Sequence, residues 1–376
     1  MTYLVLGAGR MGSAIAWDLA MRAGKDKVRI VDAREAVARA VGESLGVAWG
    51  SADLRDDDAV RPLLRAADVA VSAADYSLNE RLTRLAIEER THLCDLGGNN
   101  TVVGRQLAMS LAAERAGVTV VPDCGLAPGL ACLLAARGVE LLGRAKSVRI
   151  RVGGLPQDPR PPLGYALFFS VRGLTNEYLE QAEVVRDGET VHVRSMTEVE
   201  SLEFPPPFGK LEAFHTSGGA STLPATLAGL VDDLDYKTIR YPGHCAIVGA
   251  MIELGFLSDK AVRIGEADVV PRAFSEALLT KALGYETPDA VLVRVIVEGA
   301  DERIVYQLVD RLDPSTGHTA MARTTGYPTA AIAWMLGTGK ITKRGVVPGE
   351  RCVPVDALVT ALAERNVRID QRREAV

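Results

Sequence analysis

The chain begins with a strand, a glycine-rich turn and a helix, and this order restricts what its first half can form. Tyr3 to Leu6 is a short apolar run that predicts a buried strand. Gly7, Gly9 and Gly12 follow it as GxGxxG, and helical spacing continues from Ser13 to Arg22. The first glycine permits the tight turn, the second lets backbone amides approach a pyrophosphate, and the third allows close packing of helix on strand. The pattern therefore predicts a dinucleotide-binding fold.

An acidic residue at the end of the next strand indicates which dinucleotide is bound. The predicted strand Val28 to Val31 ends at Asp32. A carboxylate at this place accepts hydrogen bonds from both ribose hydroxyls of the adenosine and repels a 2′-phosphate. We therefore expect NAD, with use of NADP as well left open by the nearby Arg34. The predicted cofactor-binding residues are Gly7, Gly9, Arg10, Met11, Gly12, Asp32, Asp53, Leu54, Ser72 and Ala73.

Length and charge limit the classes of protein that remain. At 376 residues the chain is longer than one typical domain, so two domains are expected. A net charge of -5 gives no general basic footprint, so neither nucleic acid nor an anionic membrane is an expected partner. No apolar run approaches about 20 residues and no charged leader precedes the first strand, so we expect a cytoplasmic protein.

The cysteines predict neither a disulfide framework nor a metal site. Their number, five, is odd, and the sequence contains no CxxC motif or Cys/His cluster. Reduced thiols and no bound metal are therefore expected. Cys124 lies in a glycine-rich loop, where it is either a small packing residue or a reactive thiol.

Further strands of the first half end in loops that carry polar residues. The run Ala67 to Ala74 ends near Ser72, the segment THLCDLGG ends at Asp95, and VTVVPDCGLAPG leads to Asp123. Because parallel strands share one carboxyl edge, these loops are expected to border the cofactor. At Asp53 the turn is expected to meet the adenine, or else to precede a helix N-cap at Asp56 or Asp57.

Beyond Lys146 the pattern changes to strands with hairpin turns. The expected strands lie within residues 148–154, 165–171, 182–196, 289–299 and 303–313. The predicted fold class is α/β, a doubly wound parallel Rossmann sheet with a second, mainly antiparallel α+β domain. We predict that residues 1–122 and 342–376 form the NAD-binding domain, and that residues 123–341 form a substrate-binding and dimerisation domain, so that a homodimer or higher homo-oligomer is expected.

An ordered set of motifs covers almost the whole length: LGAGRMG, CDLGGN, PDCGLAPGL, VGGLP, LEAFHTSGG, DYKTIRYPGH, TAMARTTGY and GKITKRGVV. In this set the chain resembles the saccharopine dehydrogenase-like family, and within it the members that oxidise the ε-amino group of lysine. Saccharopine-forming relatives typically carry an asparagine-arginine segment where this chain has His215 to Gly219. The resemblance implies oxidative deamination of L-lysine at the ε-carbon with NAD as hydride acceptor. The product would be allysine, which cyclises to piperideine-6-carboxylate, and ammonia would be released.

Such chemistry requires a neutral amine, because a protonated amine cannot give up hydride. The ordinary pKa of a lysine side chain is about 10.4, so an apolar cleft and a general base are needed. Asp123 is the first candidate for this base, with a helix cap or loop brace as the alternative role. Asp95 is the second candidate, with a structural Asx-turn as its alternative. His215 is the third, with a satisfied structural histidine as its alternative.

The substrate also carries an α-carboxylate and an α-ammonium that must be held. Arg240 is the predicted partner of the carboxylate, with a solvated strand arginine as the alternative. Tyr76 and Asn79 either line the pocket or pack and cap a helix, and Thr216 and Ser217 are predicted to contact substrate beside His215. Weaker candidates are Lys237, His244 and Arg172.

Two other functions fit the same sequence. The first is a reductase of the saccharopine or carboxynorspermidine type, which joins an amine to an oxo compound. The second is a non-catalytic NAD-binding sensor whose second domain recognises a partner.

Overall fold

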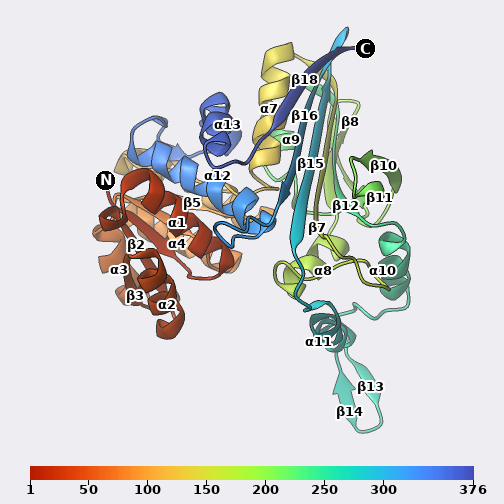
Figure 1. Cartoon of the computed structure of the whole chain (residues 1–376), viewed down its shortest axis with the longest axis horizontal. Coiled ribbons are helices and arrows are strands. Elements are labelled where there is room, and N and C mark those ends of the chain that lie inside the picture. The colour runs from red at the N-terminus through yellow and green to blue at the C-terminus, as the bar shows by residue number, and fades with distance from the viewer. The chain divides into compact units, whose positions relative to one another are not determined.

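A computed structural model describes residues 1–376, and the chain divides into two compact units (Figure 1). Unit 1 comprises Met1–Gly143, Ser221–Leu227 and Ala322–Ile369. Unit 2 comprises Arg144–Ala220, Ala228–Met321 and Asp370–Val376.

Unit 1 is built on a seven-stranded sheet in which every neighbouring pair is parallel. The strand order is β17-β6-β5-β4-β1-β2-β3. The chain adds β2 and β3 on one side of β1 and then continues with β4 on the other side, so the order of the strands reverses between β4 and β1. The strands are β1 (Tyr3–Leu6), β2 (Val28–Asp32), β3 (Ala48–Ser51), β4 (Val69–Ser72), β5 (His92–Asp95), β6 (Thr119–Val121) and β17 (Gly345–Val346). The helices are α1 (Arg10–Ala23), α2 (Glu35–Leu45), α3 (Asp57–Arg65), α4 (Asn79–Glu88), α5 (Asn100–Leu107), α6 (Ser110–Ala116), α7 (Leu130–Leu142), α9 (Leu223–Thr226), most of α12 (Ala320–Gly337) and α13 (Val355–Ala363). This confirms the predicted doubly wound sheet.

The glycine-rich turn between β1 and α1 has the geometry that its sequence requires. Gly7 has φ +106°, and a Cβ atom there would lie 2.7 Å from the carbonyl oxygen of Ala73. A Cβ atom at Gly12 would lie 1.9 Å from the carbonyl oxygen of Gly7, so α1 can lie this close to the turn only because residue 12 is glycine. At Gly9, by contrast, a Cβ atom would have no neighbour within 4 Å, which leaves open space in front of the first turn of α1.

Unit 2 is built on a nine-stranded mixed sheet with the main path β10-β11-β12-β7-β15-β16-β18. All neighbours along this path are antiparallel except β12 and β7. The strands are β7 (Ala145–Pro156), β8 (Ala182–Arg186), β9 (Glu189–Val193), β10 (Glu200–Phe204), β11 (Gly209–His215), β12 (Val231–Arg240), β15 (Asp289–Glu298), β16 (Glu302–Arg311) and β18 (Asp370–Ala375). The helices are α8 (Val171–Leu179), α10 (His244–Glu253) and α11 (Pro271–Leu283), and a separate hairpin is formed by β13 (Val262–Ile264) and β14 (Ala267–Val269) (Figure 1). The predicted second, mainly antiparallel α+β domain is thereby confirmed.

The expected strand at residues 165–171 is wrong. The segment is irregular up to Ser170, whose side chain accepts a hydrogen bond from Gly173 N at 3.1 Å and so caps α8. Tyr165 and Phe168 are buried in the apolar cluster that α8 and α10 share, instead of in a sheet. The apolar run therefore reflects side-chain packing in this cluster, which is equally compatible with an irregular segment.

The compact units divide the chain at other points than the predicted domains. Residues 123–143 and 322–341 lie in unit 1, where Gly326 of α12 lies close to Ala14 and Ile15 of α1. The last strand, β18, pairs with β16 and lies in unit 2, although it was expected in the NAD-binding domain. Since a polar strand at the end of a chain carries no signal for its partner, its sequence alone did not indicate this pairing.

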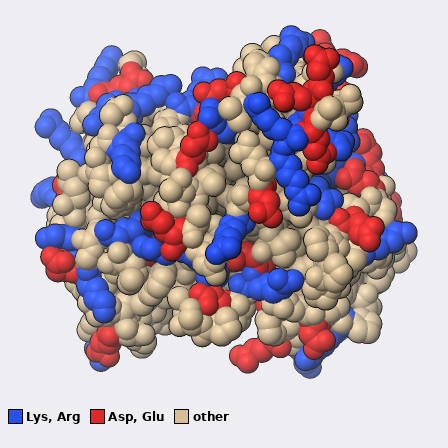
Figure 2. Space-filling model, turned by 45° about the horizontal axis from the view of Figure 1, so that its top comes forward, with Lys and Arg blue, Asp and Glu red and all other residues tan.

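Charged side chains of both signs are interspersed on the face displayed in Figure 2. No helix in the structure has both the length and the apolar character needed to cross a membrane. No group of three or more His, Cys, Asp or Glu side chains is placed to hold a metal ion.

The buried Asp289 gives a test of the fold of unit 2. Its two carboxylate oxygens accept hydrogen bonds from Ala320 N at 2.6 Å and Met321 N at 2.8 Å, at the start of α12. We expect Asp289→Ala to lower the free energy of unfolding by about 1–3 kcal/mol, because two buried amides lose their acceptor. Urea unfolding measures this change, with the exposed Asp301→Ala as control. Equal stability of the two variants would contradict the assignment.

Candidate active site

A groove of about 360 Å³ lies at the carboxyl edge of the parallel sheet, in unit 1. The loops that follow β1, β2, β3 and β4 line it, at the place where the strand order reverses. Six of the predicted cofactor-binding residues line this groove: Gly7, Gly9, Asp32, Asp53, Leu54 and Ala73. The remaining lining residues are Ala33, Arg34, Arg55, Ala74, Asp75 and Leu78.

Asp32 is held in place by backbone amides. Its Oδ2 accepts a hydrogen bond from Ala8 N at 2.8 Å, and its Oδ1 accepts one from Arg34 N at 2.9 Å. Burial acts to raise the pKa of Asp32, but these hydrogen bonds and the Arg34 guanidinium outweigh it and lower the pKa. The carboxylate is therefore negatively charged at neutral pH, at the end of β2 where a ribose would lie.

The other predicted cofactor residues do not line the groove. Arg10, Met11 and Gly12 belong to the first turn of α1, where Gly12 provides the close approach to Gly7. Ser72 is buried and donates a hydrogen bond from Oγ to Asn79 Oδ1 at 2.8 Å. Asn79 thus fixes the end of β4, which is the packing alternative considered for it.

The turn after β3 contains both a residue that lines the groove and a helix N-cap, the two roles that were predicted as alternatives. Asp53 lines the groove, and its carboxylate pairs with Arg55. Asp56 accepts a hydrogen bond from Asp58 N at 3.0 Å and is the N-cap of α3.

Asp95 joins two loops at the same edge of the sheet. It is fully buried at the end of β5, and its Oδ1 accepts hydrogen bonds from Gly97 N at 2.8 Å and Asp123 N at 3.2 Å. Its Oδ2 accepts a third from Gln106 Nε2 at 2.7 Å. Through these contacts Asp95 holds the two loops together. Its hydrogen bond with Gly97 N forms the Asx-turn that was predicted as the alternative to a catalytic role.

Asp123 differs from Asp95 because one of its oxygens has no hydrogen-bond donor. Oδ2 accepts a hydrogen bond from Ser221 Oγ, whereas the buried Oδ1 has no partner in the protein. Oδ1 occupies the space left by the missing side chain of Gly97. Burial, with the nearby charge of Asp95, raises the pKa of Asp123 from its ordinary value of 3.8 to about 8.

The loop that carries Asp123 is fixed on several sides within unit 1. Asp123 itself has φ +59°, a left-handed conformation that aspartate tolerates better than most residues. Cys124 N donates to the carbonyl oxygen of Asp95 at 2.8 Å, and Thr329 Oγ1 of α12 donates to the carbonyl oxygen of Cys124 at 2.8 Å. The Cys124 thiol is buried, and burial raises its pKa, so it is a packing residue and not a reactive thiol.

Tyr76 and a second carboxylate lie close to this loop. The ring of Tyr76 faces Gly98, where a Cβ atom would be 3.4 Å from the ring. Glu350 accepts a hydrogen bond from Thr222 Oγ1 at 3.1 Å, and burial raises its pKa. Sequence reasoning had not singled out Ser221 or Glu350. Both reach this loop only through the tertiary fold, Ser221 on segment 221–227 and Glu350 on segment 322–369 of unit 1.

In unit 2, His215 is fully buried at the end of β11. Its Nδ1 lies 3.2 Å from the carbonyl oxygen of Tyr236, and its Nε2 lies 3.1 Å from Glu198 Oε2. Both ring nitrogens are thus engaged by protein acceptors, as expected of a structural histidine. The catalytic role predicted for His215 stays a prediction.

The neighbours of His215 also have protein partners. Thr216 Oγ1 lies 2.7 Å from Thr238 Oγ1, and Ser217 Oγ donates to Glu180 Oε2 at 3.3 Å. Lys237 Nζ donates to the carbonyl oxygen of Glu198 at 2.7 Å. Arg172 forms exposed ion pairs with Asp259 and Glu276 at 3.4 Å, so it is part of the surface of α8.

Arg240, at the end of β12, is buried and bound to aromatic groups. Its Nε donates to Tyr178 Oη at 3.1 Å, and its guanidinium lies 4.5 Å from the centre of the Tyr165 ring. Glu212 is opposite Arg240 in the strand register, but its carboxylate accepts from Gly243 N and Cys245 N at the start of α10. The predicted alternative of a solvated strand arginine is therefore wrong.

The sequence of this chain matches two domains of one family. Residues 3–121 match the saccharopine dehydrogenase NADP binding domain, and residues 125–367 match the saccharopine dehydrogenase C-terminal domain. The first unit thus has a nicotinamide dinucleotide-binding domain. The chain belongs to the saccharopine dehydrogenase-like family, as its motifs predicted.

Relatives and a solved structure agree with this assignment. The chain is 28% identical over 287 residues to saccharopine dehydrogenase (NADP(+), L-glutamate-forming) of Saccharomyces cerevisiae, covering 73% of this chain and 62% of the relative. It is 22% identical over 371 residues to alpha-aminoadipic semialdehyde synthase, mitochondrial, of Rattus norvegicus, covering 78% of this chain and 39% of the relative. The chain therefore spans less than two thirds of the length of these relatives. The structure of the apo yeast saccharopine dehydrogenase (L-Glu forming) has the same fold, with a TM-score of 0.81, 21% identity and full coverage of both chains.

Asp32 gives a test of cofactor choice that does not depend on turnover. We expect Asp32→Ala to weaken NAD binding and to reduce the preference for NAD over NADP by about tenfold or more, because the repulsion of a 2′-phosphate is lost. Fluorescence titration with each dinucleotide measures both affinities, with the exposed Asp26→Ala as matched control. An unchanged ratio of the two affinities would remove Asp32 from this role.

Proposed function

We propose that this protein is an NAD-dependent lysine 6-dehydrogenase, which deaminates the ε-amino group of L-lysine oxidatively to allysine. Allysine then cyclises to piperideine-6-carboxylate, and ammonia is released. The observation that carries the proposal is Asp123, a buried carboxylate with one oxygen free of hydrogen bonds at the same sheet edge as the dinucleotide groove.

The residues of the groove fit NAD. Open space in front of Gly9 leaves room for a pyrophosphate at the start of α1, and the carboxylate of Asp32 suits the two hydroxyls of a ribose. The NADP named for the matched domain and for the yeast relative makes NADP the alternative, with the exposed Arg34 as its partner. Bound NAD supplies the hydride acceptor.

Asp123 supplies the base that amine oxidation needs. Its pKa of about 8 brings the carboxylate closer to the ordinary value of about 10.4 for a lysine ammonium, so proton transfer from ammonium to carboxylate costs less. The neutral amine then uses its nitrogen lone pair to expel hydride from carbon six, and the iminium cation that forms is stabilised by a nearby negative charge. Water adds to the iminium carbon, and the carbinolamine breaks down to aldehyde and ammonia.

Arg240 supplies a cationic group for the α-carboxylate of the substrate. The guanidinium is 3% exposed, and Nε and Nη1 donate to Tyr178 Oη and to the carbonyl oxygen of Ile239. Nη2 remains for a bound anion, and a guanidinium binds a carboxylate with strong, directional hydrogen bonds.

One assay separates the proposal from its main rival. With NAD and L-lysine at alkaline pH, the purified protein is expected to produce the absorbance of reduced nicotinamide. If lysine gives no signal, but NADH or NADPH is oxidised when an amine and an oxo acid are both supplied, the protein is a reductase of the saccharopine type. Tight dinucleotide binding without turnover in either direction would indicate the sensor.

A second prediction concerns how turnover depends on pH through Asp123. Turnover requires the ionised carboxylate, so kcat should rise as the pH increases through about 8. We expect Asp123→Asn to lower kcat by about 100-fold or more and to leave the affinity for NAD nearly unchanged. Steady-state kinetics in steps of about one pH unit, from about pH 6 to about pH 10, measure kcat. Dinucleotide titration measures the affinity for NAD.

Stability provides an independent readout for the same side chain. Because the folded pKa of Asp123 is raised, the stabilising contribution of its protonated form is complete below the ordinary value of 3.8 and is lost progressively as the pH rises through about 8. The wild-type protein should therefore lose stability relative to Asp123→Asn as the pH rises from about 4 to about 8, and lose no more above about 8. Parallel pH dependence of the two proteins, with turnover retained within a factor of a few, would show that Asp123 is only structural.

A further inference from the structure

Asp123 and Glu350 are two carboxylic acids that follow neighbouring strands of the parallel sheet. Asp123 follows the carboxyl end of β6, and Glu350 follows that of β17 in the short helix η3 (Gly349–Arg351). The two strands pair in parallel, so their carboxyl ends lie at one edge of the sheet. A Cβ atom at Gly349 would lie 3.9 Å from the side chain of Val121, the last residue of β6. The two acids therefore occupy adjacent loops within unit 1.

Two consecutive hydroxyl groups connect these acids. Ser221 Oγ donates a hydrogen bond to Asp123 Oδ2. Thr222 Oγ1 lies 3.1 Å from each carboxylate oxygen of Glu350, and because a hydroxyl can donate and accept, it suits either protonation state of the acid. Ser221 has φ +42° and Asp123 has φ +59°, so both residues are held in the left-handed region, which is strained without glycine. The contact of Thr222 with Glu350 is one of those that hold this strained pair in place.

The two acids influence each other's ionisation. Burial raises the pKa of Glu350, while its own backbone amide, the Thr222 hydroxyl and the charge of Arg351 act to lower it. Burial also raises the pKa of Asp123 to about 8, and the charges of Asp95 and Glu350 act in the same direction. A negative charge on one acid thus opposes a negative charge on the other, and the two titrate as a coupled pair.

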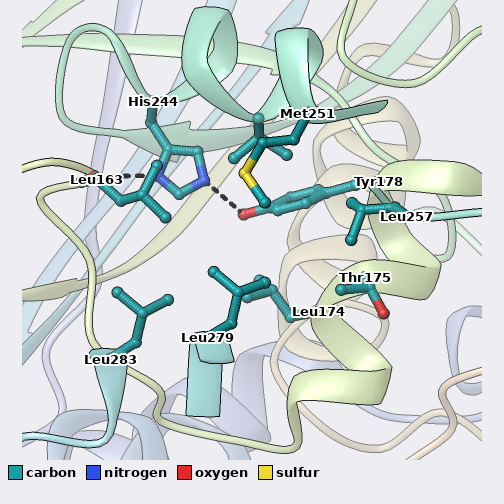
Figure 3. Close-up of a pocket in the computed structure, with 10 residues that line it drawn as sticks. Leu163, Leu174, Thr175, Tyr178, His244, Met251, Leu257, Leu279 and Leu283 are labelled. Atoms are coloured by element: carbon teal, nitrogen blue, oxygen red, sulfur yellow. Dashed lines mark hydrogen bonds between the residues drawn. The ribbon is translucent and has the colours of Figure 1, made fainter. Parts of the chain in front are cut away.

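Other buried titratable groups stay neutral near neutral pH. Burial raises the pKa of the Cys132 thiol on α7 and of the Cys352 thiol next to η3. In unit 2, His244 Nε2 lies 3.0 Å from Tyr178 Oη, and its Nδ1 lies 3.1 Å from the carbonyl oxygen of Leu163 (Figure 3). Burial lowers the pKa of this histidine to about 3, so the ring is uncharged. Neither the thiols nor this histidine changes its charge in the range where Asp123 titrates.

We propose that Glu350 is a positioning residue for Asp123, which it holds through Thr222 and Ser221 and whose ionisation it delays to higher pH. This inference rests on the proposed function, in which Asp123 is the base. Glu350 acts on the base and does not touch the substrate. A base that ionises at higher pH is better matched to a lysine ammonium, so Glu350 makes proton transfer easier.

Glu350→Gln tests the charge, because the amide keeps the shape and can still accept from Thr222. With NAD and L-lysine, we expect the pH midpoint of kcat to fall by about half a unit to one unit, and the plateau of kcat to stay within about threefold. Glu350→Asp keeps the charge and should have a midpoint closer to that of the wild type. The exposed Glu43→Gln on α2 is the matched control and should behave as wild type.

Thr222→Val tests the hydrogen bond, because it removes the hydroxyl and keeps the shape. We expect the plateau of kcat to fall by about tenfold and KM to stay within about threefold, since Asp123 is then less well held. Thr222→Ser restores the hydroxyl and should recover most of the lost kcat. The same steady-state kinetics measure both variants.

The pH dependence of stability provides a readout without turnover. Urea unfolding compares the wild type with Asp123→Asn, and Glu350→Gln with the double variant. The first difference should stop changing near pH 8, and the second at a pH lower by about half a unit to one unit.

Equal midpoints with and without the charge of Glu350, in kcat and in stability, would overturn the proposal. A Thr222→Val protein with the kcat of the wild type would also overturn it. Failure of the proposed function looks different: the wild type would not oxidise lysine, while the stability midpoint would still fall in Glu350→Gln.

Discussion

The hydrogen bonds accepted by the buried carboxylate of Asp95 are the constraint on which the candidate site depends. They tie the loop after β5 to the loop after β6 and draw Gln106 of α5 to the same point. As a result Asp123 is held in a left-handed conformation beside a second carboxylate, with little water around it. The raised pKa of Asp123 follows from this placement, so the chemistry proposed for Asp123 is a consequence of how Asp95 is satisfied.

In unit 2 the buried cation Arg240 has no ion pair, in contrast to Asp95, whose carboxylate oxygens both accept hydrogen bonds. Strand pairing places Glu212 opposite Arg240, yet the helix terminus of α10 takes up the Glu212 carboxylate and leaves Arg240 with only a tyrosine, an aromatic ring and a carbonyl. Nearby, Lys237 forms an ion pair with Glu200 at 3.3 Å, and Glu198 forms one with Arg186 at 3.1 Å. The side chains of His215 and Lys237 have partners within the protein, whereas the guanidinium of Arg240 has no ion pair, and this contrast is why we propose ligand binding for Arg240.

Sequence reasoning succeeded where the pattern is local and failed where tertiary contacts decide. The strand, glycines and acid of the first thirty-two residues carry their own geometry, so the groove was predictable, as was the position of Asp123 at a strand end. A histidine among small polar residues looked functional, but in the fold it is buried, and its two partners are the carbonyl oxygen of Tyr236 on β12 and the carboxylate of Glu198 just before β10. The strand β18 was misplaced since pairing partners are not encoded in its own polar sequence.

The central claim is that hydride leaves carbon six of lysine at a site whose base is Asp123. The most direct measurement uses L-lysine deuterated at carbon six and, separately, at carbon two, with NAD and the wild-type protein. The account predicts that deuterium from carbon six appears in the reduced nicotinamide, with a slower rate for this substrate, and that none is transferred from carbon two. Transfer of deuterium from carbon two, or no reduction with either substrate, would contradict it.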